Sequence, residues 1–299
     1  MFDGVSLEVR NFTHENFNQF LENIGQINNC NYSRGRKIVF WSNLRVYYFS
    51  NENVLRIQNS LHKFYNSEIN NFGLYNHDDF TYSKVEITIN YIENKLNVSS
   101  NEIYLKGKFE YGLNIQTFKY NPFKDIIDRF QSIVTTATNP FYVLYNENGK
   151  PFLKFCSFNQ YKIKIYDKGK QMELQSRSKI MRYEIVNHNS IKTKKVFNKS
   201  IITLNDLLDK EIWNRCFYQL LKSYNNIRVL PFPDEVSIGD YSKCLLYSSL
   251  IFKNDYYKVY KKNYKDLKLV HNSIKNNESG VYFLIRQKLE DNYRQLLLN

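Results

Sequence analysis

Three segments of this chain alternate apolar and polar residues regularly enough to predict half-buried β-strands. They are Ile103–Ile115, Tyr161–Lys168 and Ile180–Val186. Successive side chains of a strand point to opposite faces of a sheet, so each segment has one apolar face and one charged face. Antiparallel sheets commonly bury one face and leave the other polar. An antiparallel sheet is therefore the centre of the predicted fold.

The remaining patterns predict an α+β fold: an antiparallel β-sheet core with flanking helices, followed by a mainly helical C-terminal region. Further strands are predicted at Val5–Arg10, Lys37–Trp41, Arg45–Phe49, Val54–Asn59, Phe141–Tyr145 and Phe152–Phe155. Helices are predicted at Glu15–Ile24, from a cap at Asp78 and Asp79 to Leu96, from Pro122 to Val134, and at Thr203–Leu208, Glu211–Tyr224, Tyr256–Leu269 and Val281–Leu298. The domain boundary is predicted between residues 198 and 199.

The charge predicts a polyanionic partner. The 299 residues include 42 Lys and Arg against 29 Asp and Glu, a net charge of +13. Residues 151–200 hold 12 basic and three acidic side chains, so most of the excess lies there. Nucleic acid is the usual partner of such a protein. The lysines expected to contact DNA are Lys106, Lys108, Lys162, Lys164, Lys192, Lys194 and Lys195.

If the three alternating strands are neighbours, their charged faces form one surface. It would carry Glu110, Asn114, Lys164, Tyr166, Arg182 and Glu184. Two carboxylates and an amide oxygen suit Mg²⁺ or Mn²⁺. A tyrosine among lysines suits attack on a phosphodiester, because the lysines would lower its pKa. The alternative is an ordinary half-solvated sheet with charged residues outward.

Several function classes lack their motifs. The chain has no Gly-rich phosphate loop and no Gly-x-Ser-x-Gly, which disfavours an NTPase and an esterase. It also lacks the His-x-His metal motif of rolling-circle nucleases; His62 could still reach the site, or be a structural histidine. We expect a cytoplasmic protein with no membrane association, because no long apolar run, signal peptide or Cys-x-x-Cys pair occurs.

Five short segments, in this order, carry a resemblance to a known family: Ser60–Phe64, Phe109–Ile115, Lys164–Gln171, Met181–Ile185 and Ile202–Leu208. They resemble the replication initiation proteins of phages and small plasmids of Bacteroidota, which are akin to the filamentous-phage gene II protein and the plasmid rolling-circle initiators. The resemblance covers roughly residues 1 to 230.

The resemblance implies an origin-specific enzyme that nicks and rejoins one DNA strand. A tyrosine attacks the strand, stays joined to the 5′ phosphate and frees a 3′-OH, with help from Mg²⁺ or Mn²⁺. Tyr166 would be the nucleophile, with Tyr161 as the reserve candidate. The other residues carried over are the catalytic Lys168, Lys170 and Arg182, of which Arg182 would hold phosphate, and the metal ligands Glu110, Asn114, Glu184 and His62.

The resemblance also implies partners and a division of labour in a bacterial host. Residues 1–198 would form the nicking domain, and residues 199–299 would serve origin recognition or dimerisation. Origin DNA, single-stranded or supercoiled, would be the main partner, with a host helicase and a second copy of the chain as further candidates. The alternatives are a mobilisation relaxase or transposase with the same chemistry, a non-catalytic sequence-specific DNA-binding regulator, and an RNA-binding protein.

Overall fold

The computed structural model describes residues 1–27, 31–33, 35–117, 120–135, 138–172, 179–232, 236–248, 261–278 and 280–299. Its centre is a ten-stranded sheet in which every neighbouring pair is antiparallel. In spatial order the strands are β2 (Asn31–Ser33), β3 (Arg36–Trp41), β4 (Leu44–Phe49), β5 (Val54–Ser60), β1 (Phe2–Val9), β6 (Ile103–Gln116), β12 (Ile180–Asn187), β11 (Tyr161–Asp167), β10 (Pro151–Ser157) and β9 (Tyr142–Tyr145).

A smaller antiparallel sheet joins distant parts of the chain. Its order is β13 (Ile227–Val229), β7 (Phe130–Val134) and β8 (Thr138–Pro140). The chain continues from β8 into β9, the edge strand of the large sheet.

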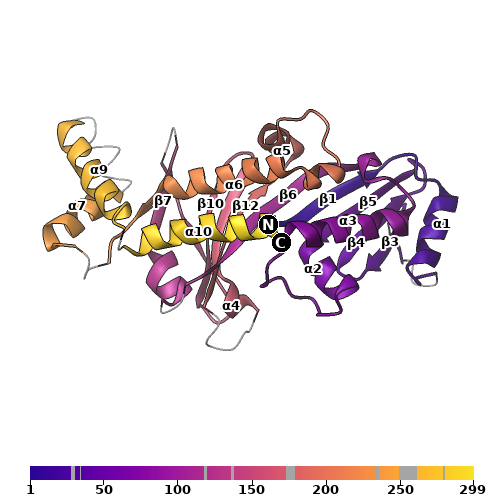
Figure 1. Ribbon diagram of the computed structural model, residues 1–299, viewed down its shortest axis with the longest axis horizontal. Helices are drawn as coiled ribbons and strands as arrows, with labels where there is room; N and C mark the ends of the chain where they lie inside the picture. Colours follow the sequence, from indigo (N-terminus) through magenta and orange to yellow (C-terminus); the bar gives the residue numbers. More distant parts are fainter. Residues whose placement is uncertain are drawn as a thin grey trace.

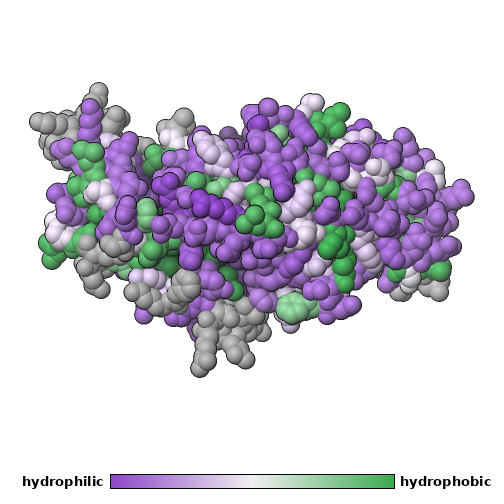
Figure 2. Space-filling model, viewed as in Figure 1, coloured by the Kyte–Doolittle hydropathy of each residue, from purple (hydrophilic) through white to green (hydrophobic). Residues whose placement is uncertain are grey.

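Helices pack on the apolar face of the large sheet. Figure 1 shows α3 (Tyr82–Leu96), α6 (Lys210–Asn225) and α10 (Val281–Leu298) lying over the strands. The other α-helices of the described residues are α1 (His14–Asn23), α2 (Leu61–Phe64), α4 (Lys168–Gln171), α5 (Ser190–Phe197), α7 (Ile238–Ser248) and α9 (Lys261–Lys275). The short π- and 3₁₀-turns are η1 (Tyr65–Ile69), η2 (Ser100–Glu102), η3 (Pro122–Ile126), η4 (Ile127–Arg129) and η5 (Asn205–Leu208). In the same view the outer surface of these helices is mostly hydrophilic (Figure 2).

The α+β class and the predicted strands are confirmed, while three local predictions are wrong. The segment from Pro122 to Val134 is two short turns followed by strand β7, because Ile133 pairs with Ile227 of β13. Helix α3 begins after Thr81, so Asp78 and Asp79 do not cap it. Residues 205–208 form only a 3₁₀ turn. The predicted helix start at residues 256–260 lies outside the described residues.

One hydrophobic core joins the two halves of the chain. Phe2 and Phe109 belong to the same buried cluster as Leu204, Trp213 and Tyr282. The predicted functional division at residue 198 stays a prediction. Among the described residues, no helix is long and apolar enough to cross a bilayer.

Two register shifts interrupt the pairing of β1 with β6. Residues 106–108 of β6 lie opposite the single residue Ser6, and Asp3 and Gly4 of β1 lie opposite Glu110. Such bulges redirect side chains and are common next to active sites. Here they change the direction of polar side chains at the middle of the sheet.

Candidate functional site

The three strands with charged faces are neighbours, as the sequence predicts. β12 pairs with β6 on one side and with β11 on the other. Arg182 lies opposite both Asn114 and Tyr166, and Glu184 lies opposite Lys164. Polar side chains from distant parts of the sequence therefore meet at the centre of the sheet.

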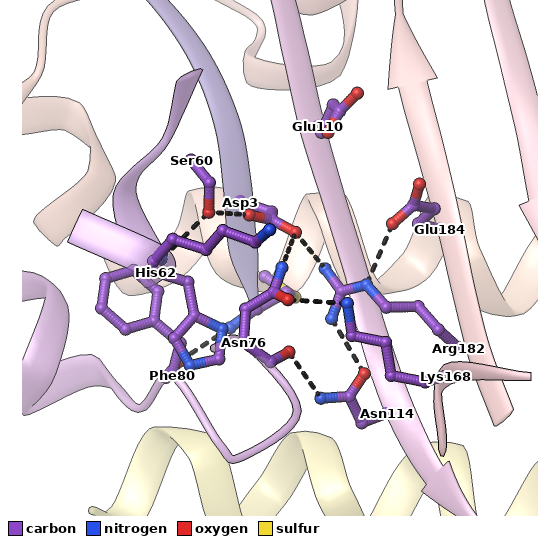
Figure 3. A network of polar contacts seen from close by, with 12 residues as sticks. Asp3, Ser60, His62, Asn76, Phe80, Glu110, Asn114, Lys168, Arg182 and Glu184 are labelled. Carbon is purple, nitrogen blue, oxygen red and sulfur yellow. Dashed lines mark hydrogen bonds and ion pairs between the residues drawn. The ribbon is translucent and has the colours of Figure 1, made fainter. Parts of the chain in front are cut away.

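Arg182 is the centre of this network (Figure 3). Its Nε donates to Glu184 at 2.9 Å, and its two terminal nitrogens donate to Asn114 Oδ1 and Asp3 Oδ2, each at 3.1 Å. Only 3% of the residue is exposed. Each of the three guanidinium nitrogens therefore donates to a side chain of the protein, and a phosphate would have to reach one of the two remaining N–H groups inside this buried network.

Asp3 is a functional candidate that the sequence analysis missed. Its carboxylate accepts hydrogen bonds from Ser60, from Asn76 at 2.9 Å and from Arg182. Burial alone would raise the pKa of Asp3, but Arg182 and Ser60 outweigh it and hold that pKa below its usual value. The available signal was an acid on the apolar phase of the strand Phe2–Val9, where Asp3 alternates with Val5, Leu7 and Val9. An acid in that position needs a partner.

Glu184 is buried and accepts three hydrogen bonds. Lys164 Nζ lies 2.8 Å from Oε1, and Oε2 accepts from Arg182 and from the Tyr166 hydroxyl at 3.2 Å. Burial by itself would raise the pKa of Glu184, but the positive charges of Lys164 and Arg182 outweigh burial and hold that pKa below its usual value. The carboxylate is therefore ionised at neutral pH.

Tyr166 lies in the network, but its surroundings oppose ionisation. The residue is only 6% exposed. Burial, and next the negative charge of Glu184, raise the pKa of Tyr166 well above its usual value. The expectation that nearby lysines lower this pKa is therefore wrong: Lys164 binds Glu184 and not the phenol oxygen. Tyr161, the reserve candidate, stacks on Phe158 with ring centroids 4.4 Å apart.

The two lysines after Tyr166 both belong to the short helix α4 but have different surroundings. Lys168 is 2% exposed, and its Nζ donates to Asn76 Oδ1 at 2.6 Å and to Gln171 Oε1 at 2.9 Å. Burial, and next the charge of Arg182, lower the pKa of Lys168 to about 8. Lys170 is exposed, 3.9 Å from the Asp167 carboxylate that caps α4. Lys168 therefore belongs to the network, and Lys170 lies at its edge.

The four expected metal ligands do not form a ligand set in this arrangement. Both oxygens of Glu184 bind cationic side chains, and Asn114 Oδ1 accepts from Arg182. Glu110 Oε1 lies 2.6 Å from Lys108 Nζ, and His62 Nε2 lies 2.8 Å from Asp78. Nowhere in the described ranges do three or more His, Cys, Asp or Glu side chains form a group that could hold a metal.

The expected DNA-binding lysines fall on two surfaces. Lys106, Lys108, Lys162 and Lys164 lie on the sheet face that bears Arg182 and Glu184, here called the polar face. Lys192, Lys194 and Lys195 lie on α5, which packs over β6 and α6 on the apolar side. A cavity of about 140 Å³ at the ends of β1 and β6 is lined by residues of both sets, Lys106 and Lys194, together with Arg10.

The polar face also extends into the N-terminal half, which the sequence analysis did not assign to DNA binding. Arg45 lies opposite Gln58, and Arg56 lies opposite both Tyr47 and Glu8. These side chains alternate with buried ones along β4 and β5. The same alternation that predicted the strands could have found them.

Gly112 creates the space that Glu184 occupies. A Cβ at this position would lie 2.5 Å from the Tyr183 carbonyl oxygen and from Glu184 Cβ. We expect Gly112→Ala to lower the free energy of unfolding by about 1–3 kcal/mol, because the backbone must move to relieve the clash. Urea denaturation measures the loss. Gly239→Ala, with no atom nearer than 3.8 Å, should lose nothing; equal stability of both variants would contradict the close packing.

The chain was compared with family models, curated proteins and solved structures, and only solved structures match. No family model matches the chain, and no curated protein matches it. A similar solved structure is that of a rolling circle replication initiator protein from Geobacillus stearothermophilus, which is 14% identical in sequence. The likeness covers 80% of this chain and 89% of the other, with a TM-score of 0.42.

Proposed function

We propose that this protein cuts and rejoins one DNA strand at a replication origin through Tyr166, and so starts rolling-circle replication. The observation that carries the proposal is the hydrogen bond from the Tyr166 hydroxyl to Glu184, beside Arg182 and Lys164 on a lysine-rich sheet face. Three of the segments that resemble initiator proteins, on β6, β11 and β12, meet at this point.

The geometry suggests how each residue would act. The Tyr166 oxygen would attack phosphorus, forming a bond to the 5′ phosphate while the bond to the 3′ oxygen breaks. The phenol proton would pass to Glu184, which already accepts it in a hydrogen bond, and the 3′ oxygen would take up a proton from water and leave as a hydroxyl. Lys164 and Arg182 keep Glu184 ionised and able to accept. Rejoining is the reverse of these steps.

Access to Tyr166 requires a rearrangement. Lys168 Nζ lies over the Tyr166 ring, 5.7 Å from its centroid, and is tied to Asn76. The bound DNA strand must displace the Lys168 side chain before the phenol can reach a phosphate, because the Tyr166 side chain is buried. Dependence on Mg²⁺ or Mn²⁺ stays a prediction, since the expected ligands are engaged with other side chains.

A non-catalytic DNA-binding regulator is the second candidate. The burial and the raised pKa of Tyr166 favour it, as does the engagement of Glu184 by two cations. Such a protein would bind through the same polar face without cutting. A relaxase or transposase would share the proposed chemistry and differ only in the DNA that it cuts.

Strand cleavage of the protein's own replicon separates the two candidates. The purified protein is mixed with its supercoiled replicon and Mg²⁺, Mn²⁺ or EDTA, and the products are run on a denaturing gel. We expect open circles with protein on the 5′ end, formed with either metal and absent in EDTA. Tight, salt-dependent binding with no cut under any condition would contradict the nicking enzyme and support the non-catalytic DNA-binding regulator.

The lysines of the polar face make a separate prediction about binding. Lys106→Ala and Lys162→Ala should each flatten the dependence of log K on log salt by about 0.7 for single-stranded DNA, since each removes one phosphate contact. Fluorescence anisotropy, recorded between about 50 and 200 mM salt, measures this slope. Lys222→Ala, on the outer side of α6, is the matched control. An unchanged slope in both polar-face variants would remove this face from the DNA contact.

A further inference from the structure

A cavity lies on the polar face beside the network and borders it at Ser60. Its volume is about 480 Å³. It sits over the two register shifts of β1 and β6, where Gly107 adopts a left-handed φ of +76°. The lining residues come from four strands: Gly4, Val5, Ser6, Arg45, Gln58, Asn59, Ser60, Gly107, Lys108 and Glu110.

The lining offers both hydrogen-bond donors and acceptors. Arg45, Gln58 and Ser6 form a row across β4, β5 and β1, and Phe40 extends the row on β3. Phe40 is 53% exposed, and the Arg45 guanidinium lies 5.5 Å from its ring centroid. An aromatic ring can stack on a base, an amide can hydrogen-bond to the edge of the base, and the two cations, Arg45 and Lys108, can bind the adjoining phosphate.

The cavity is linked to the Tyr166 site through charged contacts. Glu110 lines the cavity and lies 3.6 Å from Lys164, which in turn binds Glu184. Gly4 makes this possible, because a Cβ there would lie 2.6 Å from Glu110 Oε2. A DNA strand that runs from Tyr166 across β12 and β6 toward β1 would reach the cavity.

We propose that this cavity holds one unpaired nucleotide of the DNA strand that the protein cuts. The base would stack near Phe40 and bond to Gln58, and the adjoining phosphate would bind Arg45 and Lys108. The inference rests on the proposed function and specifies its substrate as a strand that is single near the cut, because a base paired and stacked in a duplex cannot enter.

Binding of a fluorescein-labelled oligo(dT) of about 12 nucleotides tests the cavity without requiring cleavage. We expect Gln58→Ala and Arg45→Ala each to weaken binding about tenfold, the effect of losing one hydrogen bond that involves a charged or base-specific partner. Arg45→Ala should also flatten the salt dependence, and Gln58→Ala should not. Gln219→Ala and Arg215→Ala on α6 are matched controls and should bind like the wild type.

Crosslinking identifies the contact itself. An oligonucleotide with a single 5-iododeoxyuridine, irradiated in the complex, should crosslink to Phe40, and Phe40→Leu should abolish the adduct.

Unchanged oligo(dT) binding in both Gln58→Ala and Arg45→Ala would overturn the inference even if the replicon is cut. Weakened binding without any cutting would keep the cavity and remove the proposed nicking. Binding to oligo(U) that is tighter than to oligo(dT) and lost in the same variants would overturn DNA as the occupant.

Discussion

Tyr166→Phe is expected to abolish strand cleavage, with a loss of roughly a thousandfold or more, while DNA binding is kept. The substitution removes the one atom that would bond to phosphorus. The folded protein should lose only about 1 kcal/mol, because Glu184 keeps its contacts with Lys164 and Arg182. The measurement is the fraction of replicon opened on a denaturing gel, with oligonucleotide binding followed in parallel.

Tyr161→Phe is the matched control for this experiment. Tyr161 lies on the same strand, and its ring packs against Phe158 away from Glu184. It should cut like the wild type. Cleavage that survives in Tyr166→Phe and disappears in Tyr161→Phe would move the nucleophile; survival in both would exclude β11 as its source.

Arg182→Met should lower the free energy of unfolding by about 3–5 kcal/mol. Methionine keeps much of the volume, but Asp3 loses its only cation within ion-pair distance among the described residues, and Glu184 loses one of two. A buried carboxylate that has lost its partner lowers the free energy of unfolding far more than the replacement of both partners by apolar residues. Chemical denaturation with urea, followed by circular dichroism, measures the change.

Two further variants test the reason for that loss. Adding Asp3→Asn to Arg182→Met should recover part of the stability, because the double variant no longer buries the unpaired Asp3 charge. Lys170→Met, which replaces an exposed cation in the same segment, should change stability by less than about 0.5 kcal/mol. A loss below about 1 kcal/mol in Arg182→Met would contradict its central position in the network.

The strands were predictable because their information is local. In β6, β11 and β12 the alternation assigned each side chain to a face, and the pairing of these strands brought the polar sets together. The segment at 122–134 was not predictable in this way. Its buried residues Phe123, Ile126, Ile127 and Phe130 follow a helical spacing, while strand β7 depends on β13, which lies almost a hundred residues later.

The sequence predicted that Tyr166, Arg182 and Glu184 share a site, but it did not predict that they are buried. Alternation placed Tyr166, Arg182 and Glu184 on one face, but a polar face on a strand is ordinarily solvated. Their burial depends on Asp3, Asn76 and Lys168, which arrive from the start of β1, a loop and α4. No periodic pattern marks a contact between residue 3 and residue 182. The pKa of Tyr166 followed that burial and so could not be read from sequence.

The strand order from β1 through β6 and β12 to β11 has a consequence for the DNA itself. Tyr166 shares the register position of Asn114 on β6, and the cavity lies four or more residues along that strand, at Gly107–Glu110, so the sheet holds the two sites a fixed distance apart. The sheet would act as a gauge of fixed length. An origin would then show one strongly preferred base at a constant offset from the cleaved bond, and insertions between the two would be tolerated poorly.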